Sequence, residues 1–417
     1  MNSFLDKLQP YPFERLKGLT QGLRPNASLS AINLSIGEPK HVTPEVVLKA
    51  WSQDLSGLSS YPATAGSPAL KQTIVRWLEK RYGLNDLDPE KHVLPVNGSR
   101  EALFAFAQTV IDPVQNQWVV APNPFYQIYE GAALLAGGRT YLVAQESGHA
   151  FRCDWHAVPS EVWARTALLF VCSPGNPTGA VIDLAQWKQL FELSERYGFV
   201  IASDECYSEI YFDESKPPLG ALQAAQRLNR DFSRLVSFTS LSKRSNCPGM
   251  RSGFVAGDPA LLRKFLLYRT YHGSAMNLVV QAASIAAWSD ETHVVANRKE
   301  YKAKFDAVMP ILSPVLETAW PDAGFYVWAR IPGGDDVAFT LDLLTQYNVQ
   351  VLPGSFLARD LSTIVSDRAN PGTGFIRIAL VEPLDACIEG AKRIAAHASQ
   401  LIEAKRLAVG LSNMRVA

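Results

Sequence analysis

The sequence has few cysteines, no net charge and no long apolar run. Its 5 cysteines never stand in a CxxC or other close pair, which argues against a zinc site or a disulfide framework. The 40 basic residues balance the 40 acidic ones, so we expect no general attraction to nucleic acid or to a membrane surface. No segment approaches the about 18 apolar residues of a membrane span, and the first residues carry charges where a signal peptide needs an apolar run. These absences predict a protein of the reducing cytoplasm.

What the sequence does have is length and apolar content. It holds 417 residues, 47% of them hydrophobic and 10% aromatic, which is enough for a large core and two domains. Apolar runs alternate with helical patterns through the middle of the chain, whereas the C-terminal part has long helical patterns around two strand-like runs. We therefore expect a large domain over residues 46–285 and a small α+β domain over residues 286–417. An N-terminal segment, residues 1–45, is expected to join the small domain.

Five apolar runs in the middle of the chain predict strands. Their β-branched and aromatic content is nearly continuous, as in strands covered on both faces. They lie at residues 118–121, 167–172, 199–203, 234–240 and 253–257. Helices are predicted between them, over residues 99–110 after Gly98 and over residues 184–197 between Asp183 and Gly198. This alternation predicts an α/β fold with a mostly parallel sheet and helices on both faces.

Polar or small residues follow the predicted strands. Ligands of open α/β sheets bind beyond the carboxyl ends of the strands, so these loops should converge on one site. Gly98 and Ser99 open a helix whose N-terminus suits a phosphate, and Arg251, between two glycines, suits bidentate phosphate binding. Asp204 and Glu205 end another strand, but no cluster of histidines or carboxylates matches them, so we expect no metal.

Lys243 is the residue most suited to covalent chemistry. An ordinary lysine has a pKa of about 10.4 and is a poor nucleophile at neutral pH. We expect Arg244, Arg251 and burial to favour the neutral amine of Lys243. A neutral lysine beside a phosphate site can bind the aldehyde of pyridoxal phosphate, which also needs a carboxylate for its ring nitrogen and donors for its phenolate oxygen. The loops contain a candidate for each of these needs.

Seven segments resemble those of the class I/II aminotransferases, within the fold-type-I family of pyridoxal-phosphate enzymes. They follow the family's order and span nearly the whole chain. They read SIGEP (35–39), YPATAGSPAL (61–70), NGSREAL (97–103), SPGNPTG (173–179), DECY (204–207), SLSK (240–243) and FIRIAL (375–380). The resemblance implies a pyridoxal-phosphate-dependent aminotransferase of fold type I, with a mostly parallel central sheet and a smaller α+β domain, that works as a homodimer.

The resemblance also implies a role for each matched residue. Lys243 would bind the cofactor aldehyde and then act as general base and acid, and Asp204 would pair with the ring nitrogen. The other cofactor contacts would come from the phenolate donors Tyr207 and Asn176, the stacking Tyr126, the phosphate ligands Gly98, Ser99, Arg100, Ser240 and Arg251, and Tyr61 of a second subunit. Arg377 would clamp the substrate α-carboxylate, with Gly37 and Asn176 alongside.

Two further segments indicate which substrate the enzyme uses. Residues 240–258 and 267–277 are similar to the proteobacterial succinyldiaminopimelate transaminases. This implies a ping-pong transamination between N-succinyl-LL-2,6-diaminopimelate and 2-oxoglutarate, in lysine and diaminopimelate biosynthesis. The distal carboxylate of that substrate needs a further cation, for which Arg269, His272 and Arg244 are the candidates. Arg269 and His272 fit ordinary surface or interface groups equally well.

Two alternatives use the same cofactor. An aminotransferase for aspartate, alanine or aromatic substrates would differ in the distal part of the pocket alone. A C–S lyase on the same scaffold would release ammonia and pyruvate from a sulfur amino acid. The lyase needs no oxo-acid acceptor, so an assay with and without the acceptor separates these activities.

Overall fold

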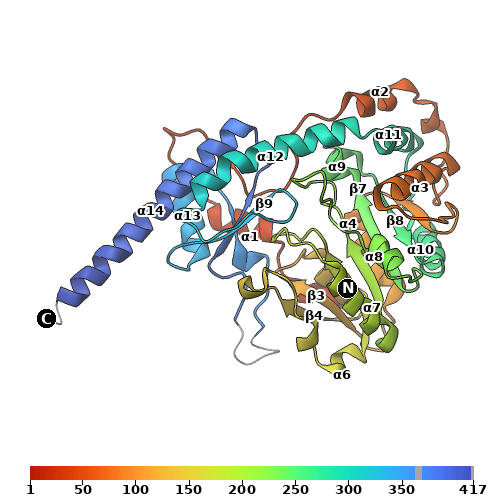
Figure 1. Ribbon diagram of the computed structural model, residues 1–417, viewed down its shortest axis with the longest axis horizontal. Coiled ribbons are helices and arrows are strands. Elements are labelled where there is room, and N and C mark those ends of the chain that lie inside the picture. The colour runs from red at the N-terminus through yellow and green to blue at the C-terminus, as the bar shows by residue number, and fades with distance from the viewer. Residues whose placement is uncertain (362–368, 415–417) are drawn as a thin grey trace.

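The protein folds into alternating helices and strands (Figure 1). The structure, a computed structural model, describes residues 1–361 and 369–414. The helices are α1 (Pro12–Thr20), α2 (Glu45–Gln53), α3 (Pro68–Tyr82), α4 (Ser99–Val110), α5 (Ile128–Leu135), α6 (Ser160–Trp163), α7 (Leu184–Tyr197), α8 (Ala221–Arg227), α9 (Leu241–Arg244), α10 (Pro259–His272), α11 (Leu278–Ser289), α12 (Thr292–Leu312), α13 (Asp336–Tyr347) and α14 (Leu384–Met414). In these described ranges no helix is both long and apolar enough to cross a membrane.

The strands form three sheets. They are β1 (Ile32–Asn33), β2 (Val93–Val96), β3 (Trp118–Asn123), β4 (Arg139–Ala144), β5 (Thr166–Cys172), β6 (Val200–Asp204), β7 (Leu235–Ser240), β8 (Gly253–Gly257), β9 (Tyr326–Arg330), β10 (Val349–Gln350), β11 (Leu352–Pro353) and β12 (Phe375–Ala379). The large sheet has seven strands in the order β2-β8-β7-β6-β5-β3-β4. Strand β8 runs antiparallel to both neighbours, and the other pairs are parallel. The predicted α/β fold with a mostly parallel sheet is confirmed.

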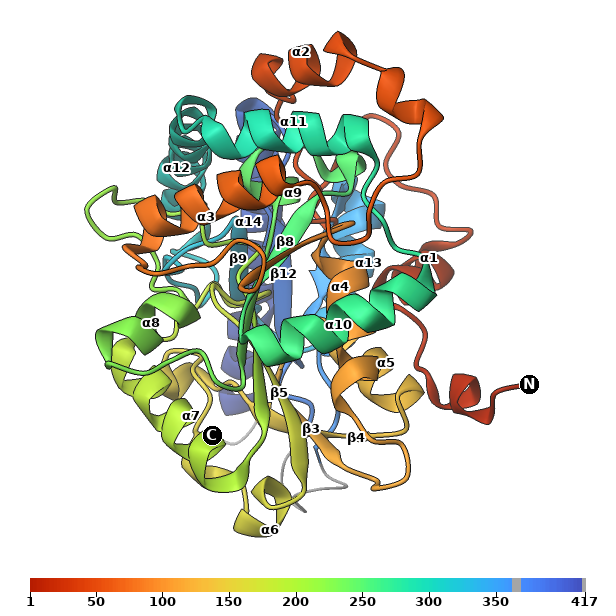
Figure 2. The same cartoon turned by 90° about the vertical axis from the view of Figure 1, so that its right-hand side faces the viewer.

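Helices cover both faces of the large sheet (Figure 2). One face packs against α3, α7, α8 and α11 in a core that includes Trp77 and Trp187. The other face packs against α4, α5 and α10 around Phe106 and Phe265. Because both faces are covered, the central strands are mostly apolar, and this is why the sequence predicts them.

The two predicted helices begin and end where expected. Helix α4 starts after Gly98, which has a φ of 88°, and α7 starts at a capping box in which Asp183 and Gln186 satisfy each other's backbone amides. Gly198 ends α7 in the left-handed conformation, with a φ of 81°. These signals fix where α4 and α7 meet the sheet edge that carries the polar loops.

The C-terminal part builds a second core. Strands β11, β12 and β9 form an antiparallel sheet, and β1 from the N-terminal segment pairs in parallel with β10. Leu34 lies in the same core as side chains of α12, α13 and α14. Helix α14 extends beyond the rest of the molecule (Figure 1). The domain limits at residues 45 and 285 stay a prediction.

Candidate active site

A pocket opens at the sheet edge where the parallel strands end. Its walls come from the loops after β3, β5 and β6, from the start of α4, from α9, and from β9 and β12 of the small sheet. Nine of the residues predicted to form the site line it: Gly37, Ser99, Arg100, Tyr126, Asn176, Asp204, Tyr207, Lys243 and Arg377. The predicted convergence of the strand-end loops is therefore present in the structure.

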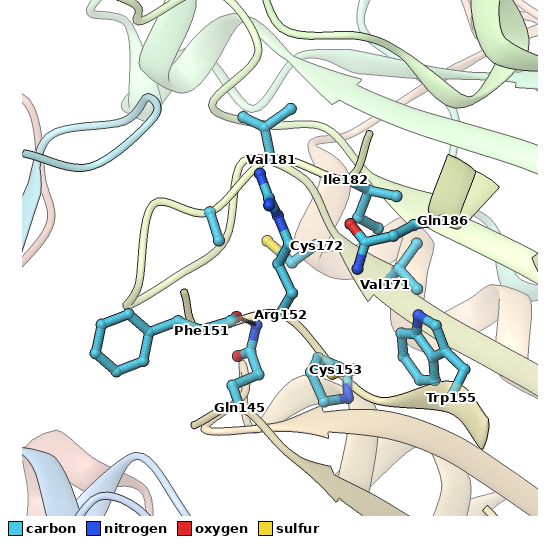
Figure 3. Close-up of a pocket in the computed structure, with 12 residues that line it drawn as sticks. Gln145, Phe151, Arg152, Cys153, Trp155, Val171, Cys172, Val181, Ile182 and Gln186 are labelled. Atoms are coloured by element: carbon cyan, nitrogen blue, oxygen red, sulfur yellow. Dashed lines mark hydrogen bonds between the residues drawn. The ribbon is translucent and has the colours of Figure 1, made fainter. Parts of the chain in front are cut away.

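A second pocket adjoins the first at Cys172, which borders both (Figure 3). Its lining is mostly apolar, with Phe151, Trp155 and Val171 around it. Arg152 is the one charged side chain among the described residues that line it, and its Nη2 lies 3.8 Å from a carboxylate oxygen of Asp322. Since this lining has neither a lysine nor a carboxylate, we place the active site in the first pocket.

Asp204 lies buried at the end of β6. Tyr129 donates a hydrogen bond to its Oδ2 at 2.9 Å, and the backbone N–H of Cys206 donates to its Oδ1 at 3.3 Å. Burial raises the pKa of Asp204, while the hydrogen bonds from Cys206 and Tyr129 oppose that rise. A protonated ring nitrogen would stabilise the carboxylate form of Asp204, because no described residue forms an ion pair with it.

Lys243 projects from the short helix α9 into the pocket. Its Nζ donates to the backbone carbonyl of Gly37 at 2.5 Å. Burial lowers the pKa of Lys243 to about 8, and the positive charges of Arg377 and Arg251 act in the same direction. With a pKa of about 8, about a tenth of the amine is neutral at pH 7, far more than for an ordinary lysine, and covalent chemistry at this lysine requires the neutral form.

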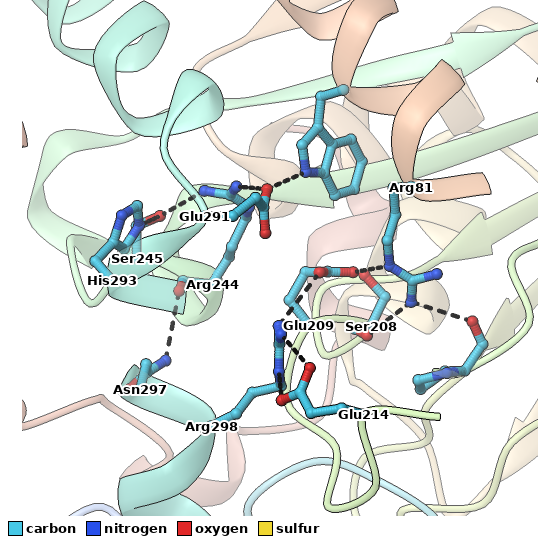
Figure 4. A network of polar contacts seen from close by, with 12 residues as sticks. Arg81, Ser208, Glu209, Glu214, Arg244, Ser245, Glu291, His293, Asn297 and Arg298 are labelled. Carbon is cyan, nitrogen blue, oxygen red and sulfur yellow. Dashed lines mark hydrogen bonds and ion pairs between the residues drawn. The ribbon is translucent and has the colours of Figure 1, made fainter. Parts of the chain in front are cut away.

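Arg244 does not contribute to the site, so two expectations about it are wrong. Its side chain lies in a buried polar network, where it pairs with Glu291 and donates to the carbonyl of Ala287 at 2.8 Å (Figure 4). Only 1% of Arg244 is exposed. It therefore neither lowers the pKa of Lys243 nor offers a cation to a distal carboxylate.

Arg251 packs against the glycine that begins α4. A Cβ added to Gly98 would lie 2.4 Å from Nη2 of Arg251, so no other residue fits there without displacing the guanidinium. The antiparallel direction of β8 puts Arg251, which precedes that strand, at the same edge as the carboxyl ends of its neighbours. The N-terminus of α4 and the arginine together make a candidate anion site.

Ser99 and Ser240 flank this anion site. Ser99 accepts a hydrogen bond from the thiol of Cys206 at 2.9 Å. Ser240 caps α9 by accepting from the backbone N–H of Ser242 at 3.1 Å, and its hydroxyl donates to the carbonyl of Ser252 at 3.1 Å. A phosphate contact from Ser240 stays a prediction.

Arg377 lies at the deep end of the pocket, with 2% of it exposed. It donates to Oδ1 of Asn176 at 2.9 Å and to the carbonyl of Ser35 at 2.7 Å. Its Nε is buried and has no partner among the described residues. A buried guanidinium with a free donor is suited to a carboxylate, because the unmet hydrogen bond is costly until a ligand meets it.

Two tyrosines shape the space beside Arg377. The hydroxyls of Tyr207 and Tyr326 lie 3.1 Å apart, and the guanidinium carbon of Arg377 lies 4.3 Å from the centre of the Tyr326 ring. A Cβ on Gly37 would lie 1.8 Å from the Tyr326 hydroxyl. Gly37 is thus the residue that lets Tyr326 reach into the pocket.

Arg269 does not reach the pocket, contrary to its suggested role. Its side chain is fully buried, where it donates to Glu101 at 2.5 Å and to the carbonyl of Ser274 at 2.7 Å. A buried arginine that already has these partners cannot extend to a substrate in this pocket or in that of a second subunit. His272 is exposed and bonded to Ser274, and its role stays a prediction.

Three residues at the site were not predicted from the sequence. Tyr129 holds Asp204, Tyr326 covers Arg377, and Tyr11 closes the outer wall. Tyr129 follows Tyr126 by three positions, a spacing that puts both rings near each other, 5.8 Å between centres. That spacing could have indicated that Tyr129 lies near the site. Tyr11 and Tyr326 come from segments far away in the sequence.

These residues fit pyridoxal phosphate. The anion site of Gly98 and Arg251 suits its phosphate, and Asp204 suits its ring nitrogen. Lys243 lies in the same pocket as Asp204 with a lowered pKa, and Tyr126 contributes an aromatic ring. No group of histidines, cysteines or carboxylates that could hold a metal occurs in residues 1–361 and 369–414.

Comparison with known proteins identifies the family. The model of "Aminotransferase class I and II" matches residues 30–383. An LL-diaminopimelate aminotransferase of Desulforudis audaxviator is 30% identical over 395 residues, which cover 93% of this chain and 95% of that protein. A crystal structure of an aminotransferase from Neisseria meningitidis is 53% identical, with a TM-score of 0.91, covering 95% of this chain and 99% of the other.

A third relative carries a more specific name. It is a probable N-succinyldiaminopimelate aminotransferase of Thermus thermophilus, 28% identical, with a TM-score of 0.81 over 93% of this chain and 100% of the other. The family match covers far more than half of this chain, and the solved structures share its α/β fold. The chain therefore belongs to the class I and II aminotransferases of fold type I, which use pyridoxal 5′-phosphate.

Proposed function

We propose that this aminotransferase exchanges the amino group of N-succinyl-LL-2,6-diaminopimelate with 2-oxoglutarate by a ping-pong mechanism. The observation that carries this choice is the charge of the pocket. Three cationic side chains, Lys243, Arg100 and Arg377, line it, and Asp204 is the one carboxylate among the described lining residues. Asp204 is buried and hydrogen-bonded, so a substrate with two or more carboxylates and no distal ammonium suits this lining best.

Each residue has a definite task in this proposal. Arg377 holds the α-carboxylate through its guanidinium, and this turns the Cα–H bond of the substrate toward Lys243. Pyridoxal phosphate, when bound, supplies the electron sink for the charge that develops at Cα. Lys243 takes the proton from Cα as the free amine and returns it as the ammonium, for which a pKa of about 8 is well suited.

The contacts to the cofactor are part of the same proposal. Lys243 holds the aldehyde, Asp204 the ring nitrogen, and Tyr126 stacks on the ring. The phenolate oxygen is assigned to Asn176 and Tyr207, and the phosphate to Gly98, Ser99, Ser240 and Arg251, with Tyr61 of a second subunit. Tyr61 is 102% exposed, so its side chain is free to meet a second copy of the chain.

The decisive experiment is a substrate panel with the pyridoxal-phosphate-loaded protein. N-succinyl-LL-2,6-diaminopimelate and unmodified LL-diaminopimelate are compared as donors to 2-oxoglutarate, with glutamate formation as the readout. We expect kcat/KM for the succinylated donor to be higher by about 10-fold or more, the effect of one charge-assisted contact. Equal or lower turnover of the succinylated donor would reject this substrate assignment.

Unmodified LL-diaminopimelate is the second candidate. A curated relative of that name is 30% identical to this chain over 93% of its length. The same panel therefore includes aspartate, alanine and phenylalanine as donors, and a sulfur amino acid without any acceptor. Pyruvate formed without an oxo acid would instead assign the C–S lyase reaction.

A further inference from the structure

A chain of polar side chains connects the loop that follows Gly37 to the backbone of Lys243. His41 in this loop lies with its Nδ1 2.7 Å from Oδ1 of Asn297, which belongs to α12. The amide nitrogen of Asn297 donates to the backbone carbonyls of Lys243 and Arg244, at 3.3 and 3.4 Å. These carbonyls lie at the end of the short helix α9, and Figure 4 shows the bond to Arg244. The loop therefore reaches the backbone of Lys243 through one side chain.

The same loop also contacts the other end of Lys243. Its Nζ donates to the carbonyl of Gly37 at 2.5 Å. Gly37 and Lys243 line the active-site pocket, whereas His41 and Asn297 are not among the described residues that line it. His41 and Asn297 can therefore act on a ligand in the pocket only through Lys243 and the loop.

The orientation of the Asn297 amide follows from its partners. Asn297 is 3% exposed, and Nδ2 of Asn246 donates to its Oδ1 at 3.0 Å. The two backbone carbonyls of α9 can only accept hydrogen bonds, so the nitrogen of Asn297 must face them and its oxygen must face His41. Nδ1 of His41 therefore carries the proton of the hydrogen bond to Asn297.

The other side of the His41 ring favours the same tautomer. Nε2 of His41 lies 2.6 Å from Nζ of Lys304, and Lys304 is 2% exposed. A lysine holds its proton to a higher pH than a histidine, so Lys304 is the donor and Nε2 of His41 is the acceptor. Burial lowers the pKa of His41, and the charge of Lys304 acts in the same direction, against Asn297 and the carboxylate of Glu300. His41 is therefore neutral at neutral pH, with its proton on the nitrogen that faces Asn297.

We infer that Asn297 and His41 are positioning residues that hold the end of α9 so that the amine of Lys243 points into the pocket. This rests on the proposed function, in which that amine binds the cofactor and transfers the proton. Helix α9 has 4 residues, so its own hydrogen bonds fix it only weakly. Without the donor from Asn297, the carbonyl of Lys243 would turn toward water and the amine would leave the carbonyl of Gly37.

The first measurement is the pH dependence of Lys243 labelling by an amine reagent, in the full-length protein without its cofactor. Wild type should show a midpoint near pH 8, the value to which burial lowers the pKa of Lys243. Asn297→Ala should move the midpoint toward about 10.4, the ordinary pKa of lysine, because the released amine meets water. His41→Phe, which keeps a ring but has no donor, should move the midpoint in the same direction. His41→Asn, whose amide nitrogen can replace Nδ1, should restore most of the wild-type profile.

The second measurement uses the pyridoxal-phosphate-loaded enzyme and glutamate, with cofactor absorbance as the readout of a single turnover. Asn297→Ala should lower the limiting rate by about 10- to 100-fold, because a misplaced amine transfers the proton poorly. The half-saturating glutamate concentration should change by less than about 3-fold, since Arg377 is unaltered. Gln281→Ala is the matched control: Gln281 is 2% exposed and donates to the carbonyl of Met276 at 2.8 Å, outside the pocket. It should lose stability but keep the Lys243 labelling profile and the limiting rate.

The labelling needs neither cofactor nor substrate, so it separates this inference from the proposed function. A shifted midpoint in Asn297→Ala, together with poor turnover of the succinylated donor by wild type, would support the positioning role and reject the proposed substrate. A Lys243 midpoint that stays at the wild-type value in both Asn297→Ala and His41→Phe would overturn the inference. A shift of equal size in Gln281→Ala would also overturn it, because a general loss of stability would then explain the result.

Discussion

In the proposed function, one nitrogen of Lys243 both binds the cofactor aldehyde and transfers a proton. We predict that Lys243→Ala lowers the transamination rate by at least about 100- to 10,000-fold, the usual contribution of a general acid–base group. Borohydride reduction followed by peptide mass spectrometry should find the cofactor attached to the peptide that contains Lys243. Lys302→Ala changes an exposed lysine on α12 and should leave both results unchanged.

The lowered pKa of Lys243 has a consequence for pH. Since its pKa falls to about 8, the neutral amine becomes the main form above that pH, whereas ordinary lysines stay protonated up to a pH of about 10.4. With the cofactor removed, labelling of Lys243 by an amine reagent should rise through pH 8 and then level off. Labelling of the surface lysines as a group should continue to rise. A Lys243 profile that follows the surface lysines would contradict the burial argument.

Position 37 requires a glycine because a side chain there would contact Tyr326, and not because of its backbone φ. We predict that Gly37→Ala lowers kcat/KM by up to about 100-fold, because the new Cβ would displace the Tyr326 hydroxyl and shift the substrate. Gly18→Ala is the control, since Gly18 lies exposed in α1 with nothing within 4 Å. That change should leave activity intact and raise stability by about 0.5 to 1 kcal/mol. Steady-state kinetics and thermal unfolding measure the two effects.

At the scale of elements, the position of α9 depends on an ion pair between a buried arginine and a half-buried glutamate. Arg244 and Glu291 join α9 to the start of α12, and Trp77 on α3 also donates to Glu291 at 3.0 Å. Glu291→Ala should destabilise the fold by up to about 3 kcal/mol, because it leaves a buried guanidinium without its counter-charge. Glu192→Ala removes an exposed pair with Lys188 and should cost under about 0.5 kcal/mol. Urea unfolding at one protein concentration compares the free energies of unfolding of the two variants.

The sequence predicted the central strands better than the edge strands. Strands β3 and β5 to β8 are buried on both faces and read as continuous apolar runs. Strands β2 and β4 lie at the sheet edges, where Pro95 and the exposed Arg139 are tolerated and the apolar pattern weakens. Most site residues were therefore named from the loops that follow the central strands, whereas Gly98, Ser99 and Arg100 follow the edge strand β2 and were named from the start of a helix and from the family motif.

Side-chain direction was the main thing the sequence could not supply. Asp204, Lys243 and Arg377 meet in one pocket as expected, because strand ends and motif spacing fix their backbone positions. Arg244 and Arg269 are turned inward by Glu291 and Glu101, partners that lie 47 and 168 residues away in the chain. No local pattern reports such a pairing.

At the scale of the molecule, an exposed apolar surface supports the proposed homodimer. Leu48, Leu55, Leu58 and Tyr61 on and after α2 are between 52% and 102% exposed. We predict that the protein sediments as a dimer and that Leu58→Asp dissociates it, because a charge there would be buried at the contact. Val114→Asp alters another exposed apolar residue and should remain dimeric. A wild-type monomer in analytical ultracentrifugation would contradict the shared-site arrangement.

Because β8 runs antiparallel to β7, Lys243 and Arg251 lie in one short connection between the two strands. Ser240 at the end of β7 pairs directly with Gly253 at the start of β8, so the segment between them is a closed hairpin connection. The amine of Lys243 and the guanidinium of Arg251 both belong to that connection. An insertion or deletion in this connection would change the spacing between Lys243 and Arg251, the residues proposed to hold the aldehyde and the phosphate of the same cofactor.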